Sequence, residues 1–146
     1  MQWSKLKKRI ESNFSEELKD RVTLFSTWYK QGGSPQRGRA SVLLDKIEIY
    51  EANTDKWIMN RVNNEEVNDD ILIERLEFHK LLEQYLNLSI EEALESKHVL
   101  IQGLAIIDKR LGKRRLINMN IIENQFVKKL YSLRCEIEGI SIKNNL

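Results

Sequence analysis

The sequence predicts a single α+β domain: an N-terminal helix, a three-stranded antiparallel meander, then three to four C-terminal helices packed on the sheet. A stretch of β-branched and aromatic residues around residue 25 precedes a glycine-containing loop. Apolar residues then recur at helical spacing in the second half of the chain. The 146 residues are close to the usual size of one domain, so we expect residues 1–146 to form a single one.

The first helix is expected over residues 4–14, with Ser4 able to cap its start. Its apolar residues recur every three to four positions, at Trp3, Leu6, Ile10 and Phe14. Four cations crowd its first turns, namely Lys5, Lys7, Lys8 and Arg9. The helix dipole disfavours each cation there by about 0.3–1 kcal/mol. The cluster therefore predicts an anionic partner, either the acidic middle of the chain or an external molecule.

The three strands of the meander are predicted over residues 21–30, 39–44 and 46–51. The loop between the first two contains the only proline of the chain. Asp45-Lys46 is the predicted tight turn between the second and the third. In the third strand, alternation places Ile47 and Ile49 on one face, with Glu48 and Tyr50 on the other.

A polar stretch over residues 52–68 favours a loop, and the chain then becomes helical. Helices are expected over residues 69–86, 89–96, 100–111 and 123–138. The first is capped by Asn68 or Asp69, and Ser89 with Glu92 forms a capping box for the second. The third is indicated by a regular series of apolar residues, Leu100, Leu104, Ile107 and Leu111. Gly112 and Gly139 are expected to end the last two helices.

Charge is unevenly distributed, although the net charge is only +2. Residues 1–39 hold nine Lys and Arg against four Asp and Glu, residues 40–96 five against fourteen, and residues 97–146 ten against four. Such a chain either neutralises itself on folding or presents a bipolar surface to a charged partner. The first outcome is the more common, because charge runs usually end as solvated faces.

Several classes of function lack their sequence signals. No stretch approaches the roughly 20 apolar residues of a membrane span, and no signal peptide is visible, so no membrane partner is expected. The only cysteine, Cys135, cannot form an intrachain disulfide and is expected in the core, which favours a cytoplasmic protein. His79 and His98 are too far apart for a metal motif. Gly112-Lys113 lacks the other residues of a phosphate-binding loop. No catalytic residue, metal or cofactor is therefore predicted.

Residues 108–116 stand out because five cations fall within seven positions: Lys109, Arg110, Lys113, Arg114 and Arg115. In a structural interpretation, these cations complement the C-terminal end of a helix and Asp108 pairs with its neighbours. Arg114 and Arg115 then tie the last two helices to the acidic middle, and the long side chains cover apolar surface.

Two other interpretations of this segment assign it a partner. In one, the five cations bind phosphate groups, with Lys5 and Lys8 extending the surface. Contact with a nucleic-acid backbone would follow, and Trp28 or Tyr29 would stack on a base. In the other, the segment binds an acidic protein.

Four separated segments of the chain also resemble a bacterial family of small uncharacterised proteins. They are WSKLKK at 3–8, STWY at 26–29, LAIIDKRLGKRRL at 104–116 and LRCEIEG at 133–139. The resemblance leaves the middle, about residues 51–75, unmatched. It implies a bacterial cytoplasmic protein and no particular activity.

The leading hypothesis is a non-enzymatic binding module whose basic segment contacts phosphate groups, above all those of nucleic acid. A second is a protein-interaction role, such as an accessory or immunity-type partner. Its working surface would be the acidic middle, with Glu65, Glu66, Asp69 and Asp70. A third is an enzyme, which requires a cleft that gathers His79 or His98 with arginine and carboxylate side chains.

Overall fold

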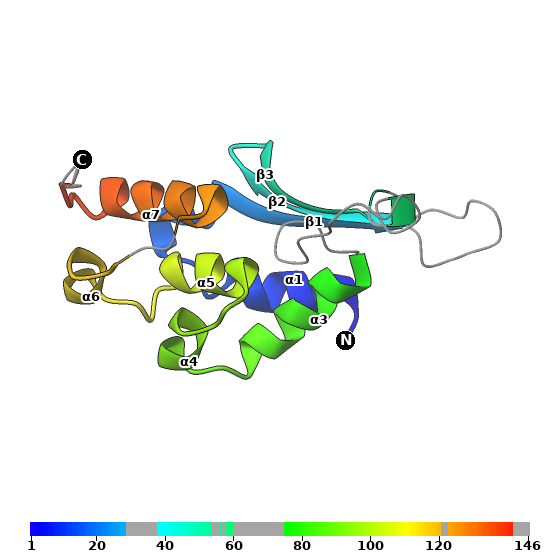
Figure 1. Ribbon diagram of the computed structural model, residues 1–146, viewed down its shortest axis with the longest axis horizontal. Coiled ribbons are helices and arrows are strands. Elements are labelled where there is room, and N and C mark those ends of the chain that lie inside the picture. The colour runs from blue at the N-terminus through cyan, green and yellow to red at the C-terminus, as the bar shows by residue number, and fades with distance from the viewer. Residues whose placement is uncertain (29–37, 54–55, 57, 60–74, 121–122, 142–146) are drawn as a thin grey trace.

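A three-stranded sheet lies on a layer of helices (Figure 1). The computed structural model describes residues 1–28, 38–53, 56, 58–59, 75–120 and 123–141. The predicted fold class is confirmed: a helix comes first, a three-stranded antiparallel meander follows, and the described remainder is helical. Among these residues, no helix combines the length and apolar character needed to cross a membrane.

The sheet has the order β1-β2-β3, with β1 at Val22–Trp28, β2 at Gly38–Leu44 and β3 at Ile47–Asn53. The predicted turn at Asp45-Lys46 is confirmed, and both residues have positive φ, 49° and 70°. Such a two-residue turn matches the right-handed twist of the strands. The Arg21 guanidinium donates to both carboxylate oxygens of Asp45, at 3.1 and 2.9 Å, and so holds the turn against the start of β1.

The predicted faces of β3 need a correction. Tyr50 is buried in the core, whereas Ile47 is 68% exposed and Ile49 is only partly buried. A β-bulge explains the difference, because Val42 pairs with Tyr50 while Leu43 pairs with Glu48. The extra residue shifts the alternation by one position, so the strand does not keep a single inward-facing set.

Helix α1 spans Trp3–Glu11, and its residues Leu6 and Ile10 are fully buried. The predicted cap was wrong: Gln2, not Ser4, precedes the first turn, and its side chain makes no capping hydrogen bond. A 3-10 helix, η1, follows at Glu16–Leu18. The Leu24 N–H of edge strand β1 donates to Glu11 Oε2 at 2.7 Å. This bond satisfies a donor on the edge of the sheet, where an unpaired N–H would invite pairing with another chain.

The second half of the chain contributes five described α-helices. They are α3 at Arg75–Leu86, α4 at Ile90–Leu94, α5 at Val99–Ile106, α6 at Lys113–Ile117 and α7 at Gln125–Ile137. The predicted capping box of Ser89 and Glu92 opens α4, with both of its hydrogen bonds present. Gly139 follows α7 with a φ of 67°, which agrees with its predicted role as a helix stop. The caps predicted at Asn68 or Asp69 lie outside the described residues.

The end predicted for α5 was wrong. The helix stops at Ile106 instead of Leu111, and Gly112 is the N-cap of α6 with a φ of −82°. The predicted apolar series is nevertheless buried throughout, since Ile107 and Leu111 are both inaccessible to solvent. Periodic burial therefore continues past the point where the helical backbone ends.

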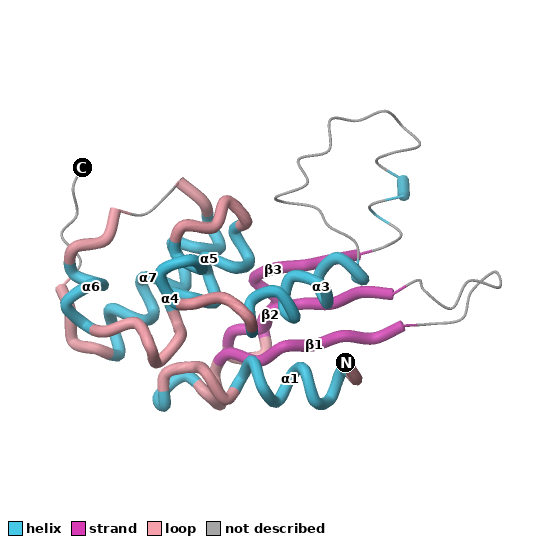
Figure 2. The backbone as a smooth tube through the Cα atoms, turned by 90° about the horizontal axis from the view of Figure 1, so that it is seen from below, coloured by secondary structure: helices cyan, strands magenta, loops and turns pink. Residues whose placement is uncertain are grey.

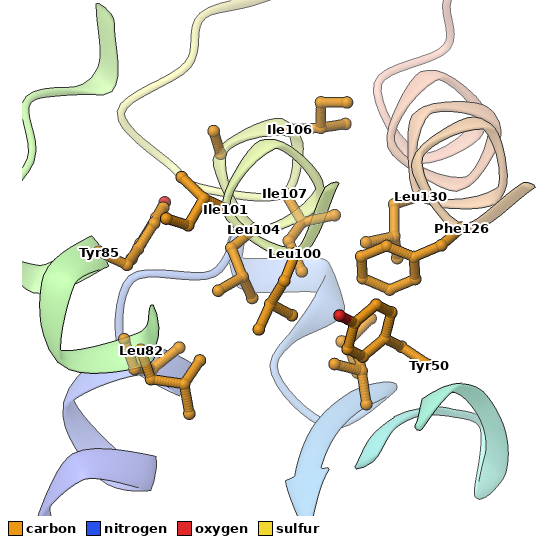
Figure 3. Packing of buried hydrophobic residues seen from close by; sticks show 14 of the residues in the cluster. Tyr50, Leu82, Tyr85, Leu100, Ile101, Leu104, Ile106, Ile107, Phe126 and Leu130 are labelled. Carbon is orange, nitrogen blue, oxygen red and sulfur yellow. The ribbon is translucent and has the colours of Figure 1, made fainter. Parts of the chain in front are cut away.

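Helix α5 forms the centre of the core. All of its residues except Gln102 are buried. Figure 3 shows Leu100 and Leu104 between Leu82 and Tyr85 on one side and Tyr50 with Phe126 and Leu130 on the other. The Tyr50 and Phe126 rings lie 4.9 Å apart at 48°, and so connect the sheet to α7. With only Gln102 partly exposed, α5 offers little surface to a partner.

Candidate phosphate-binding surface

The predicted basic segment begins in the turn between α5 and α6, residues 107–112. One side chain holds this turn from inside: Arg134 on α7, which is only 4% exposed. Its guanidinium donates to the carbonyl oxygens of Ile106, Asp108 and Leu111 at 2.9, 2.8 and 2.7 Å. Its Nε donates to Glu138 at 3.0 Å. The planar fork of arginine therefore satisfies the Ile106 and Leu111 carbonyl oxygens, and it adds a second donor to Asp108 O, which also accepts from Leu111 N–H at 3.0 Å.

Asp108 is a fully buried carboxylate within the same turn. It accepts hydrogen bonds from the Tyr85 hydroxyl at 2.5 Å and from the Arg110 guanidinium at 3.1 and 2.9 Å. Burial, together with the bond to Asp108, raises the pKa of Tyr85 well above its usual range. The bidentate bond to Asp108 likewise raises the pKa of Arg110. Arg110 is thus committed to an internal ion pair, as the structural interpretation predicts.

Arg115 also has a partner within the chain. Its Nη1 lies 3.0 Å from Glu91 Oε1 at the start of α4, and both side chains are exposed. The predicted link from the basic segment to the acidic middle therefore exists at Arg115. Exposed pairs of this kind contribute at most about 1 kcal/mol, so an external anion can compete for this guanidinium.

The three other cations of the segment point to solvent. Lys109, Lys113 and Arg114 are exposed, and none of them forms an ion pair within the described part of the chain. Lys113 and Arg114 open α6, whereas Lys109 lies in the turn before it. We call these three residues the basic surface.

The predicted extension over Lys5 and Lys8 lies on α1, where both side chains are exposed. The segment after α1 runs beside the turn, because Ser15 N–H donates to Ile107 O and Lys109 N–H donates to Asn13 O, each at 2.8 Å. Lys109 therefore lies next to the C-terminal end of α1. Helix α6 itself lies at one end of the molecule, well away from α1 along the long axis (Figure 2). The two basic elements form an extended arrangement and not one compact cluster.

The other predicted contributors to binding are not brought to this surface. Trp28 is 49% exposed, but it ends β1 at the opposite end of the molecule from α6. Tyr29 and the acidic residues of the alternative interface, Glu65, Glu66, Asp69 and Asp70, lie outside the described residues. His98 is a helix cap, since its Nδ1 accepts from Leu100 N–H at 3.2 Å. In the described ranges, no group of three His, Cys, Asp or Glu residues could hold a metal ion.

The structure brings together a further set of residues that the sequence analysis did not combine. The Ser26 hydroxyl lies 2.8 Å from His79 Nε2 and accepts from Arg75 Nε at 3.1 Å. Arg75 and His79 are four residues apart, and in a predicted helix this spacing already places them on the same face. Ser26 is about fifty residues away in the sequence. Only the fold, which places α3 against the sheet, brings its hydroxyl within hydrogen-bond distance of both side chains.

Comparison with known proteins shows the family of the chain. A family model matches residues 2–74 and 59–135. The chain belongs to the SF0329 protein family. Membership of an uncharacterised family agrees with the resemblance seen in the sequence, and the match includes the middle residues that the resemblance left out. No curated protein and no solved structure matches the SF0329 chain.

Proposed function

We propose that this SF0329 protein binds phosphate groups, and specifically the backbone of nucleic acid, through the basic surface of Lys109, Lys113 and Arg114. The observation that carries the proposal is the division of the five cations. Arg110 is tied to a buried carboxylate and Arg115 to Glu91, whereas the remaining three are exposed without an ion pair in the described chain.

Chemistry favours phosphate as the ligand of these three cations. Lysine presents a point charge and arginine a planar fork, and both match the oxygens of a phosphate group. Arg134 and Asp108 hold the turn that carries Lys109, so that residue starts from an ordered backbone. Little backbone conformational entropy is then lost on binding.

The extended arrangement favours a long ligand over a small one. A nucleic-acid backbone repeats its charge along its length, so it can reach the basic surface and the Lys5 and Lys8 side of α1 together. Contacts to phosphates carry no direct sequence information, and the proposed binding is therefore largely independent of base sequence.

We place this activity in the bacterial cytoplasm. The motif resemblance described above supports a bacterial origin. A single cysteine, buried in α7, supports a reducing compartment.

Filter binding of duplex DNA and of RNA, at low and at physiological salt, tests the proposal. We expect binding at low salt that weakens steeply as salt rises. The triple variant Lys109→Gln, Lys113→Gln and Arg114→Gln should lose at least tenfold in affinity. No binding of either nucleic acid at low salt would contradict the proposal.

A matched control removes the same number of charges elsewhere. Lys46→Gln, Lys80→Gln and Lys97→Gln change three exposed lysines on other elements. This control should bind within about threefold of the wild type. Equal losses in the two triple variants would show that only total charge matters. A separate variant, Lys5→Gln with Lys8→Gln, measures whether α1 takes part.

A further inference from the structure

The polar cluster of Ser26, Arg75 and His79 lies between β1 and α3, apart from the basic surface. Ser26 follows Val22 and Leu24 in the alternation of β1, so it shares the face of the sheet that meets the helices. Arg75 and His79 lie one turn apart on α3, in line with the buried residues Phe78 and Leu82. The apolar side of α3 thus brings both polar side chains against the strand.

Small residues on β2 make room for this cluster. Ser26 pairs with Ala40, and Trp28 pairs with Gly38. A Cβ atom added to Gly38 would lie 2.2 Å from Thr27 O and 2.7 Å from Arg75 Cδ. Any other residue at position 38 would therefore displace the strand or push Arg75 away from Ser26.

The imidazole of His79 is held in place from the opposite side. The Trp3 ring stacks on it, with centroids 4.9 Å apart and an angle of 21° between the planes. Burial lowers the pKa of His79 to about 4, and the positive charges of Arg75 and the N-terminus act in the same direction against Glu83. The ring is therefore neutral at pH 7, and with the proton on Nδ1 its Nε2 is free to accept the Ser26 hydroxyl proton.

We propose that Ser26 is an activated nucleophile, with His79 as its general base and Arg75 as the hydrogen-bond donor that positions Oγ. The two hydrogen bonds supply a base within hydrogen-bond reach of the hydroxyl proton and a donor that fixes the position of the hydroxyl oxygen. Both Ser26 and His79 are partly exposed.

The proposed reaction is hydrolysis of an activated ester, because a weakly basic leaving oxygen departs from the tetrahedral intermediate more readily than an amine does. Ser26 Oγ attacks the carbonyl carbon and its proton passes to His79 Nε2. The tetrahedral intermediate collapses as the bond to the leaving oxygen breaks, and the imidazolium returns the proton to that oxygen. Water then hydrolyses the acyl-serine by the same steps, with His79 again as the base.

A fluorophosphonate probe tests this proposal on the wild-type protein. Ser26 Oγ forms a bond to phosphorus, the P–F bond breaks, and the hydroxyl proton and fluoride leave as HF. Mass spectrometry of the intact protein and of its peptides locates the adduct. We expect one adduct, on Ser26, formed about a hundredfold faster in the folded protein than in urea. Ser12 is an internal control, because it is exposed and its hydroxyl donates to Arg9 O instead of a histidine.

Two variants separate activation from accessibility. His79→Gln keeps a polar side chain but removes the base, and Ser26→Ala removes the nucleophile. Labelling at pH 7 should fall about a hundredfold in the first and disappear in the second, with folding checked by circular dichroism. Absence of an adduct on Ser26, equal rates in folded and unfolded wild type, or undiminished labelling of folded His79→Gln would each overturn the proposal. None of these outcomes bears on phosphate binding.

Discussion

At the scale of single residues, the basic segment depends on two buried charges. Arg134 donates to the carbonyl oxygens of Asp108 and Leu111 in the 107–112 turn and of Ile106 just before it, and Asp108 binds Tyr85 and Arg110. Buried charges are costly unless their hydrogen bonds are complete, and here both side chains have several partners. The turn that carries Lys109 is therefore ordered by residues that would take no part in binding a ligand.

Replacing Arg134 should show how much the turn depends on it. Arg134→Met keeps most of the side-chain volume but removes the donor to the Ile106 and Leu111 carbonyl oxygens, whereas Asp108 O keeps its bond from Leu111 N–H. We expect the free energy of unfolding to fall by about 3 kcal/mol or more, measured by urea denaturation. Lys129→Met, at an exposed position of the same helix, is the control and should change it by less than about 0.5 kcal/mol. A loss below about 1 kcal/mol for Arg134→Met would contradict this account of the turn.

His79 should make stability depend on pH in a defined direction. Its pKa is about 4 in the folded protein against 6.5 ordinarily, so between these values the unfolded chain binds a proton that the folded chain does not. Stability contributed by this group is therefore present above pH 6.5 and is lost as the pH falls from 6.5 to about 4. His79→Gln should lose less stability over that range than the wild type, in urea unfolding at pH 7 and pH 5.

A neighbouring lysine provides the comparison for this pH effect. Lys80 is exposed on the same turn of α3, and Lys80→Gln should keep the pH dependence of the wild type. An identical loss of stability between pH 7 and pH 5 in wild type and His79→Gln would show that the ring is not held neutral by the fold.

At the scale of elements, α5 and α7 approach closely because α5 carries a glycine at their contact. A Cβ atom on Gly103 would lie 2.4 Å from Phe126 Cε2 and 3.1 Å from Leu130 Cδ1. Phe126 is itself buried against Tyr50, so its ring has little room to move. The glycine lowers the helix propensity of α5, and tight packing against α7 offsets that loss.

Gly103→Ala should therefore destabilise the protein despite the better helix propensity of alanine. Overpacking costs about 1–3 kcal/mol, against a propensity gain of about 1 kcal/mol, so we expect a net loss of about 1 kcal/mol. In a Phe126→Leu background the same change should cost less, because the smaller side chain leaves space. Thermal unfolding of the four proteins measures the coupling. A stabilised Gly103→Ala would mean that the two helices are not in tight contact.

The elements also show which parts of the fold a sequence can predict. The meander, the Asp45-Lys46 turn and the Ser89 capping box depend on neighbouring residues, and all were predicted. The end of α5 was not, because Arg134 and Asp108 stabilise a turn there through partners more than twenty residues away. The apolar residues keep a helical spacing up to Leu111 because the apolar residues of the turn are also buried in the core, although the helix has already ended.

At the scale of the whole molecule, the uneven charge of the chain is only partly neutralised by folding. Several acids of the middle third have nearby partners: Glu91 with Arg115, Glu51 with Lys56 and Glu48 with Arg39. The described acids do not pair with Lys109, Lys113 or Arg114. Composition predicted a basic C-terminal third. It could not show which of these cations form ion pairs, because the partner of a cation such as Arg115 lies on another element, far away in the sequence.

The salt dependence of nucleic-acid binding is the most direct test of the central claim, that these three cations contact phosphates. Each phosphate contact contributes about 0.9 to the slope of log affinity against log salt concentration for a duplex. The triple variant of Lys109, Lys113 and Arg114 to glutamine should therefore lower the magnitude of the slope by about 2 to 3. The matched variant of Lys46, Lys80 and Lys97 should leave it unchanged. Equal slopes for wild type and the first variant would contradict the claim.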